Sequence, residues 1–389
     1  MDYDKNLISE FEGYFGRKPS VISRAPGRLE ILGNHTDYNE GFVLSCAVSC
    51  AVTVVMAEND LDVCRLRDPK YDKDAVYTFS LDDIDTAIPG DWTNYVKGVI
   101  VELRKRGKNV KNFDALLYNT VPMSAGMSSS AALEVGFSFA FKELFGLEFT
   151  NEEWAKIGQG VENNYMGLKT GLLDQFSSIF GKKNELILSD FRTVEVLRTV
   201  AVPPGYSFVV ANSMVKHDLV DSEYNVRRED CENAATKLNK VYVGAKTLRD
   251  ITPAQLEESK ALLSGNEYKR AAHVVGECDR VKQAVAALDN NDVATFGKLL
   301  FESHESSKVN FENSTVELDY LVELAKSLNG CLGSRLSGGG FGGISIHLVE
   351  NSKIEEYTSK LAAAFKLQVG VDPQIIVCEI GQGAEVVKL

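Results

Sequence analysis

The sequence predicts an α+β fold in two domains. Apolar patterns with the period of a strand and others with the period of a helix are mixed along the chain, without the regular alternation of a doubly wound sheet. The length of 389 residues is more than one ordinary core supports and suits two domains of common size. We place the domain boundary after the turn at Pro203 and Pro204, which gives domains of residues 1–204 and 205–389.

The strands expected in the first domain come from two stretches. Residues 42–56 are rich in Val and Ala and predict buried sheet. Residues 113–121 place apolar side chains on one face with a period of two, and Pro122 ends this strand. A further apolar run, LILSDF near residue 190, precedes the domain boundary.

Two helices complete the expected first domain. Residues 128–145 carry apolar side chains on nearly all sides, which predicts a buried helix. Residues 152–166 predict a second helix, and Gly167 is suited to end it. In the second domain we expect a strand at YSFVVANS, long helices between residues 218 and 328, and strands at 344–349 and 374–380.

Composition and charge narrow the class of protein. The chain has 44% hydrophobic and 25% charged residues and a formal net charge of −13, so a phosphate backbone is not an expected partner. The most apolar window, residues 42–57, is shorter than the ~20 residues that a membrane span needs. The start of the chain lacks a secretory signal, and the seven cysteines form no CxxC pair. We therefore expect a cytoplasmic protein without a membrane or nucleic-acid partner.

The stretch ILGNHTDYNEG, residues 31–41, gathers polar side chains between two glycines after an apolar pair. The side chains of this stretch that could hold a polar ligand are Asn34, His35, Thr36, Asp37 and Tyr38. Such a cluster is typical of a turn that binds a polar ligand, although each of these side chains could also be satisfied within an ordinary turn.

The stretch VPMSAGMSSSAALE, residues 121–134, joins a strand to a helix through small residues. A loop of this kind leaves backbone N–H groups uncovered, and the positive end of the helix dipole points at the loop, so phosphate is the expected ligand. The residues of this loop are Ser124, Ala125, Gly126, Met127, Ser128, Ser129 and Ser130. The alternative is a serine-rich helix cap without a ligand.

Glycines dominate a third stretch, SGGGFGGI at residues 337–344. Its match to GxGxxG is nearly automatic, and a strand follows it where a dinucleotide site needs a helix. No GxxxxGK[ST] sequence occurs, which excludes a P-loop. The glycine-rich stretch is either a loop whose bare backbone approaches a ligand or another loop, or a simple hairpin entry.

Taken together, these stretches resemble the GHMP small-molecule kinases and, within them, the galactokinases. RAPGRLEILGNHTDYNEG resembles the family's first motif and sugar signature, VPMSAGMSSSAALE its ATP-phosphate motif, and GSRLSGGGFGGI its third motif. Two further matches are ENNYMGLKTGLLDQ and NSMVKHDLVDSEYNVRREDCE. The resemblance runs from about Arg24 to the carboxyl end, with the motifs in the family's order.

The resemblance implies a two-domain GHMP kinase fold, with a first domain like domain 2 of ribosomal protein S5 and a ferredoxin-like second domain. It also implies an ATP- and Mg²⁺-dependent sugar 1-kinase, which as a galactokinase makes α-D-galactose 1-phosphate and ADP. The implied substrates are a hexose and ATP, and we expect a monomer. The active site should lie between the domains, where such ligands usually bind.

The resemblance also implies roles for single residues. Asp174 is the candidate base that accepts the proton of the sugar hydroxyl, and Arg28 stabilises charge near the transferred group. By composition alone, Asp174 would be a helix cap and Arg28 a structural ion-pair partner. Glu162 is the implied Mg²⁺ ligand, with Ser130 as the hydroxyl ligand and Ser129 as its competitor.

Sugar binding falls to a second set of residues under the same resemblance. The implied sugar-binding residues are Asn34, His35, Thr36, Asp37, Gly171 and Tyr224. Trp92, in a family-like string near the nucleotide side, is interpreted as a core residue rather than a ligand contact.

One position departs from the sugar signature, because Asn34 stands where typical galactokinases have glutamate. An amide still accepts a hydrogen bond but loses the stronger charge-assisted one, so we expect the contact to be weakened or re-aimed. This departure keeps two alternatives open. One is a kinase for another sugar, such as an N-acetylated galactosamine, an arabinose or an altered galactose, and the other is a sugar- and ATP-sensing regulator without turnover.

Overall fold

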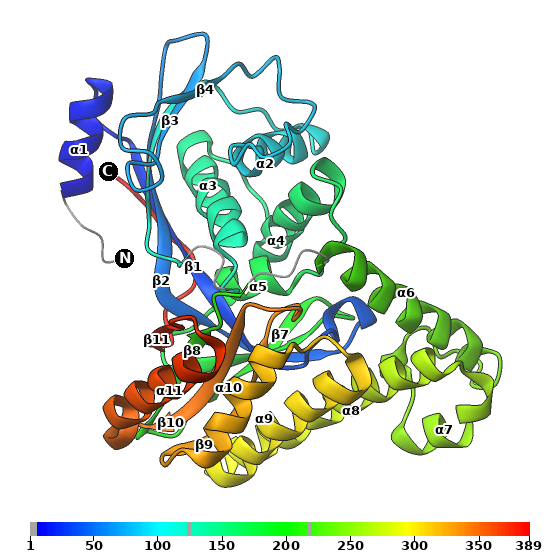
Figure 1. Ribbon diagram of the computed structural model, residues 1–389. Coiled ribbons are helices and arrows are strands. Elements are labelled where there is room, and N and C mark those ends of the chain that lie inside the picture. The colour runs from blue at the N-terminus through cyan, green and yellow to red at the C-terminus, as the bar shows by residue number, and fades with distance from the viewer. Residues whose placement is uncertain (1–5, 123–125, 216–219) are drawn as a thin grey trace.

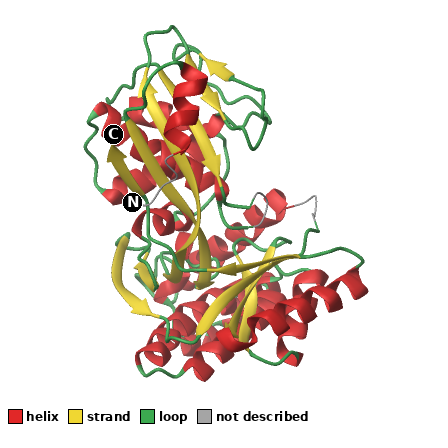
Figure 2. Ribbon diagram, turned by 90° about the vertical axis from the view of Figure 1, so that its left-hand side faces the viewer, coloured by secondary structure: helices red, strands yellow, loops and turns green. Residues whose placement is uncertain are grey.

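The computed structural model describes residues 6–122, 126–215 and 220–389, and it contains two β-sheets with helices packed on them (Figures 1 and 2). Ser124 and Ala125 of the expected phosphate loop lie outside the described residues. Among the helices that are described, none is both long and apolar enough to cross a membrane.

The first sheet has eight strands in the order β12-β1-β2-β5-β3-β4, and β6 pairs with β2 and with β7. The strands are β1 (Val21–Leu32), β2 (Phe42–Glu58), β3 (Cys64–Arg67), β4 (Tyr77–Phe79), β5 (Phe113–Asn119), β6 (Glu185–Asp190), β7 (Glu195–Ala201) and β12 (Glu385–Lys388). The helices that belong to this half are α1 (Asn6–Phe15), α2 (Asn94–Lys105), α3 (Ser129–Phe145), α4 (Asn151–Gly160) and α5 (Leu173–Phe180). Because α3 is apolar nearly all round, it packs on β1 and β2 and is covered in turn by other helices.

The second sheet has four strands in the order β11-β8-β10-β9. These strands are β8 (Tyr206–Asn212), β9 (Cys331–Ser337), β10 (Ile344–Glu350) and β11 (Gln374–Cys378). The helices of this half are α6 (Val220–Asn239), α7 (Pro253–Glu258), α8 (Gly265–Asp289), α9 (Val293–Ser306), α10 (Val316–Ser327) and α11 (Ile354–Val369). Helices α9 and α10 pack on β9, and α8 also contacts β1 and β2 of the first sheet.

Short helical turns occur at several connections. The 3₁₀ turns are η1 (Asp37–Asn39), η3 (Leu248–Asp250), η4 (Lys260–Leu262) and η6 (Asn351–Lys353), and the π-helical turns are η2 (Val161–Tyr165) and η5 (Ser307–Phe311). The turn η2 continues α4 directly, so the single helix expected over 152–166 is an α-helix followed by a π turn, and Gly167 follows with a φ of +76°.

The structure confirms the α+β class. It also shows that the end of the chain returns to the first sheet. The expected elements at 42–56, 113–121, 128–145, 344–349 and 374–380 are all present within a few residues. The last strand, β12, leaves the second half and pairs antiparallel with β1, from Val21 opposite Lys388 to Arg24 opposite Glu385. The boundary between residues 204 and 205 remains a prediction. Strand β12 lies after this boundary in the sequence but belongs to the first sheet.

Candidate functional site

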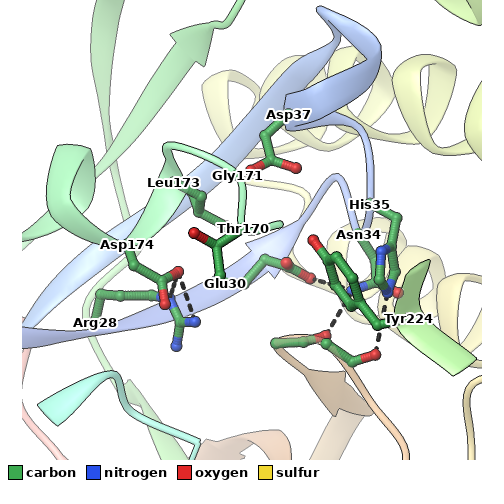
Figure 3. Close-up of a pocket in the computed structure, with 12 residues that line it drawn as sticks. Arg28, Glu30, Asn34, His35, Asp37, Thr170, Gly171, Leu173, Asp174 and Tyr224 are labelled. Atoms are coloured by element: carbon green, nitrogen blue, oxygen red, sulfur yellow. Dashed lines mark hydrogen bonds and ion pairs between the residues drawn. The ribbon is translucent and has the colours of Figure 1, made fainter. Parts of the chain in front are cut away.

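A cavity of about 180 Å³ lies where β1, the turn after it, α5, α6 and the glycine-rich loop meet (Figure 3). The residues that line it are Arg28, Glu30, Asn34, His35, Asp37, Thr170, Gly171, Leu173, Asp174, Tyr224, Gly338 and Gly339. Most of the sugar-binding and catalytic residues expected from the sequence are thus gathered around one small polar space, although they come from distant parts of the chain.

Asp174 is held at one side of this cavity by an arginine and a serine. The Arg28 Nε donates to Asp174 Oδ1 over 2.8 Å, and Arg28 Nη2 lies 2.7 Å from the same oxygen. The other carboxylate oxygen, Oδ2, accepts a hydrogen bond from the Ser128 hydroxyl. The Asp174 side chain is 30% exposed and lies in the first turn of α5, where it makes no capping bond. These contacts fix the orientation of the Asp174 carboxylate.

Arg28 is also tied to the loop that precedes α3. Its Nη1 donates to the carbonyl oxygen of Gly126 over 2.6 Å, and its side chain is 7% exposed. Ser128 is the N-cap residue of α3 but makes no side-chain capping bond, because its hydroxyl is directed at Asp174. The start of α3 is therefore built into the site, which an ordinary serine-rich cap would not be.

Asn34 lines the cavity, and its amide is bonded within the protein. Its Nδ2 donates to Glu30 Oε1 over 2.9 Å and to the Gly338 carbonyl over 2.8 Å. Its Oδ1 accepts from Asn313 Nδ2 over 3.1 Å. A direct contact between Asn34 and a sugar stays a prediction, and what the geometry adds is that this amide joins β1 to the glycine-rich loop.

His35 sits in the left-handed region, with a φ of +59°, and both ring nitrogens have partners. Nε2 lies 3.1 Å from the Gly339 carbonyl, which can only accept, so Nε2 carries the proton and Nδ1 accepts from the Tyr38 hydroxyl over 2.9 Å. Burial lowers the pKa of His35 to about 3, with the nearby His273 acting in the same direction. His35 is therefore neutral at physiological pH.

Thr36 is the one expected sugar-binding residue that does not line the cavity. It is fully buried, and its hydroxyl lies 2.7 Å from the carbonyl oxygens of both Gly33 and Phe42. Through these contacts Thr36 joins the start of the turn, at Gly33, to the strand that follows it, at Phe42.

Asp37, Gly171 and Tyr224 form the part of the cavity wall that the resemblance assigns to the sugar. A Cβ atom at Gly171 would collide with the carboxylate of Asp37, so only glycine allows this close approach. Burial raises the pKa of Asp37, and the charge of Asp174 adds to this. The Tyr224 ring lies 5.1 Å from the His35 ring between centroids.

Glu162 and Glu134 form a buried acidic pair behind Asp174. Glu162 accepts a hydrogen bond from the Thr170 hydroxyl over 2.6 Å. Burial raises the pKa of Glu162, with the charge of Asp174 as the next cause. Burial, followed by the charge of Glu162, holds the pKa of Glu134 well above its usual range, and Glu134 Oε1 is buried without a partner among the described residues. A cation beside these carboxylates would offset their repulsion.

A second cavity, of about 230 Å³, lies beside the first turn of α3. It is lined by Val52, Asp68, Tyr71, Trp92, Tyr95, Leu117, Asn119, Ser129, Ser130 and Leu133. Trp92 packs against the core as expected, but it also lines this cavity, and its Nε1 is buried without a partner among the described residues. The aromatic rings suit a flat base, and the start of α3 separates this space from the cavity of Asp174.

The remaining residues of the phosphate loop flank this helix start. Gly126 has a φ of +60°, and Met127 is buried with its carbonyl bonded to the Arg28 N–H over 3.1 Å. The glycine-rich stretch behaves as expected for a loop that approaches another loop, since Gly338 and Gly339 accept from Asn34 and His35.

Sequence reasoning missed Glu30 and Thr170, which also line the cavity. Glu30 lies two residues after Arg28 on the same strand, so alternation along β1 could have placed both side chains on one face. The signal was hidden because β1 is buried on both faces and therefore shows no alternation of polar and apolar residues.

Comparison with known families gives three matches along the chain. Residues 9–58 match the galactokinase galactose-binding signature, residues 94–182 the GHMP kinases N terminal domain, and residues 284–367 the GHMP kinases C terminal domain. The first match contains Arg28 and the turn at Asn34, and the second contains the start of α3, Glu162 and Asp174.

Full-length relatives agree with these matches. The chain is 41% identical to a galactokinase of Glaesserella parasuis serovar 5, over 97% of this chain and 98% of that one. It is 39% identical to a galactokinase of Roseiflexus sp., over 97% of this chain and 95% of that one. Its structure is similar to that of Lactococcus lactis galactokinase complexed with galactose, with a TM-score of 0.92 and 32% identity over 98% of each chain.

Proposed function

This chain belongs to the galactokinase family of the GHMP kinases, and from that membership we infer that it transfers a phosphoryl group from ATP to galactose. The products are α-D-galactose 1-phosphate and ADP. One observation supports the assignment of residues below. Asp174 faces a small polar cavity, and its partner Ser128 is the N-cap residue of α3, whose first two residues line a second, aromatic cavity.

Asp174 is the general base of this proposal. As the anomeric oxygen forms its bond to the γ-phosphorus, the hydroxyl proton passes to Asp174, and the bond to the bridging oxygen breaks to release ADP. Arg28 holds the carboxylate in place through two of its nitrogens. In this proposal the fixed positive charge of Arg28 stabilises the charge that builds up on the transferred group.

The polar cavity binds the sugar. Its size and its lining of carboxylates, an imidazole and a phenol suit a molecule with several adjacent hydroxyl groups. Asp37, fixed against Gly171, and Tyr224 contribute contacts at the outer wall. Neutral His35 and the amide of Asn34 hold the wall that faces the glycine-rich loop.

The aromatic cavity binds the base of ATP, and the start of α3 binds its phosphates. Backbone N–H groups at a helix start attract anions, and the hydroxyls of Ser129 and Ser130 line the cavity at that point. A nucleotide with its base between Tyr71, Trp92 and Tyr95 would place its phosphates beside Ser128 and therefore near Asp174.

The residues present also fit a Mg²⁺ ion. Among the described residues no group of three or more acidic, histidine or cysteine side chains could hold a metal by itself. Mg²⁺ bound with phosphates normally uses only one or two protein ligands, which Glu162 and the hydroxyl of Ser130 would supply. Ser130 and Glu134 lie one turn apart on α3. Glu162 is close enough to Glu134 for the charge of Glu162 to raise the pKa of Glu134. The ion would neutralise charge that develops on the phosphates.

We further propose that the enzyme is a cytoplasmic monomer that uses neither nucleic acid nor membrane as a partner. The net charge of −13 and the seven cysteines, all of which are unpaired, support this assignment.

The proposal is tested with purified protein, ATP and Mg²⁺ and a panel of sugars, by following ADP release and identifying the phosphorylated carbon by ³¹P NMR. Galactose should have the highest kcat/KM, and the product should be the 1-phosphate. If galactose is among the poorest substrates while an N-acetylated galactosamine or an arabinose is turned over well, the assigned substrate is wrong. If galactose and ATP bind tightly without ADP release, the chain is a sensor and not a kinase.

A further inference from the structure

We propose that Glu30 is a specificity-determining residue, which accepts a hydrogen bond from a single hydroxyl of the sugar other than the anomeric one, and that Asn34 and Arg335 are the residues that position it. This inference rests on the proposed function, because it names a sugar contact within the same cavity.

The position of Glu30 is the first support. Glu30 follows Arg28 by two residues on β1, and both side chains line the cavity. Figure 3 shows Glu30 between the Arg28–Asp174 pair on one side and the group of Asn34, His35 and Tyr224 on the other. A ligand that reaches Asp174 therefore passes beside the carboxylate of Glu30.

The bonding of the Glu30 carboxylate is the second support. Oε1 accepts from Asn34 Nδ2 over 2.9 Å and from Arg335 Nη2 over 3.0 Å. No other donor to this carboxylate is recorded among the residues that the structure describes, so Oε2 is left for another partner. The residue is 4% exposed and lines the cavity, so a ligand in the cavity is the partner that Oε2 can reach. A sugar hydroxyl in the cavity would supply that partner.

Strand β9 also fixes the backbone of Glu30, through Ser337. The Glu30 backbone N–H donates to the Ser337 hydroxyl over 3.2 Å, and that hydroxyl in turn lies 3.0 Å from the Glu30 carbonyl. Arg335 and Ser337 both belong to β9, so the second half of the molecule fixes the position of a side chain from the first half. A carboxylate held in this way can discriminate between sugars that differ at one hydroxyl.

This arrangement explains why position 34 carries an amide. The Asn34 Nδ2 has two acceptors, the carboxylate of Glu30 and the carbonyl of Gly338. A glutamate at position 34 could donate to neither, and it would place a second negative charge against Glu30 in a buried space. The carboxylate that this wall offers to a sugar is thus carried by β1, and the turn carries the amide that orients it.

The experiment combines one substitution with a set of deoxygalactoses, each of which lacks one hydroxyl other than the anomeric one. Binding to the full-length protein is measured by titration calorimetry, and KM and kcat are measured where turnover occurs. In the wild type, removal of the contacted hydroxyl should weaken binding roughly tenfold or more, the amount typical of a hydrogen bond to a charged group. In Glu30→Gln, galactose itself should bind roughly tenfold more weakly, and that same deoxygalactose should lose most of its disadvantage.

The controls separate a sugar contact from a merely structural role. Glu267→Gln is the matched control, because Glu267 is also buried and paired with a cation, Lys237, but lies outside the cavity. The affinity of the Glu267→Gln protein for galactose should equal that of the wild type. The KM for ATP should be unchanged in both variants. If Glu30→Gln does not fold, Glu30→Asp keeps the charge opposite Arg335 and withdraws the carboxylate by one methylene, with the same expected profile.

Two results would overturn the inference. One is unchanged affinity of the Glu30 variants for galactose, and the other is an equal loss for every sugar in the set, as a general loosening of the cavity would produce. In either case wild-type turnover of galactose would leave the proposed function in place. Absence of that turnover would instead reject the proposed function, and the present inference with it.

Discussion

Asp174 is the residue on which the proposed chemistry depends most directly, because both of its oxygens are already held by Arg28 and Ser128. In Asp174→Asn the side chain keeps its size but loses its capacity to take a proton. We expect kcat to fall by roughly 10²–10⁴, the range typical of general base catalysis. Galactose affinity, measured by calorimetry, and the melting temperature should change little.

A surface carboxylate provides the control for that experiment. Asp289 forms an exposed ion pair with Arg198, and Asp289→Asn should keep wild-type kcat. If Asp174→Asn retains most of its turnover, the transfer does not need this proton acceptor, and Asp174 would be reduced to a residue that aligns the sugar.

The raised pKa of Glu162 leads to a prediction of how activation by Mg²⁺ depends on pH. Its raised pKa means that it is protonated at a higher pH than an ordinary glutamate, and only the ionised form binds a cation. As pH falls through this raised pKa, the Mg²⁺ concentration needed for half-maximal activity should therefore rise. The measurement is a Mg²⁺ titration of activity at fixed ATP over a series of pH values.

The Glu162→Gln variant gives the comparison for the pH series. Without an ionisable side chain at this position, the requirement for Mg²⁺ should be high at every pH and should lose most of its pH dependence. A variant that keeps the wild-type curve would show that another group, such as Glu134, carries the titration.

At the scale of single residues, the sequence predicted the site through motifs and missed what depends on contacts across the chain. Arg28, Asp174 and the serines stand in strings whose chemistry can be named without a structure. Glu30 stands in such a string too, but its partner Arg335 is 305 positions away. No local sequence pattern indicates that the guanidinium of Arg335 donates a hydrogen bond to the carboxylate of Glu30.

At the scale of elements, two helix starts have the same kind of cap residue and different uses for it. Thr150 caps α4 in a reciprocal capping box with Glu153. Ser128 is the N-cap residue of α3, but its hydroxyl is bonded to Asp174 and makes no capping bond. The two positions therefore form a natural pair of matched substitutions.

The pair predicts opposite effects on stability and activity. Thr150→Ala should lower the free energy of unfolding by about 1 kcal/mol, the usual value for a lost cap, and leave kcat unchanged. Ser128→Ala should lower kcat and leave the free energy of unfolding nearly unchanged. Urea unfolding and steady-state kinetics of both variants provide the check. A large loss of stability in Ser128→Ala would mean that its main role is to hold the fold.

Elements with strong local patterns were predictable, and those defined by their neighbours were not. The strand at 113–121 and the helix at 128–145 are confirmed as β5 and α3, with starts and ends within two residues. Strand β1 was not predicted, since it contains a proline, a glycine and charged side chains. It is a strand because it pairs along its length with β2, which tertiary structure decides.

At the scale of the whole molecule, the two halves are joined at the site itself. The backbone N–H groups of Gly33 and Asn34 both donate to Glu277 Oε2 on α8, over 3.0 and 3.1 Å. Burial acts to raise the pKa of Glu277, but the combined effect of Arg280, His273 and Arg335 outweighs burial and keeps the pKa well below its usual value. Glu277 therefore stays ionised at neutral pH, and the turn that carries the polar residues of the cavity is anchored to the second half.

A second connection between the halves is strand β12, which supplies β1 with a neighbour on its outer side. Removal of residues 385–389 would leave the backbone of β1 unpaired along that edge. Four cross-strand pairs are lost, so the free energy of unfolding should fall by roughly 1–4 kcal/mol. Urea unfolding followed by circular dichroism gives this value, and removal of Leu389 alone, which keeps the four pairs, is the control. An unchanged urea midpoint in the longer truncation would contradict the prediction.

The pairing of β1 with β12 also has a consequence for biosynthesis. During translation, residues 21–24 leave the ribosome long before residues 385–388, their partners in the finished sheet. The nascent chain must therefore hold an incomplete edge while more than three hundred further residues are added. Arg28 lies four residues after this paired segment on the same strand, so the strand that carries Arg28 gains its outer neighbour only after residues 385–388 have been synthesised.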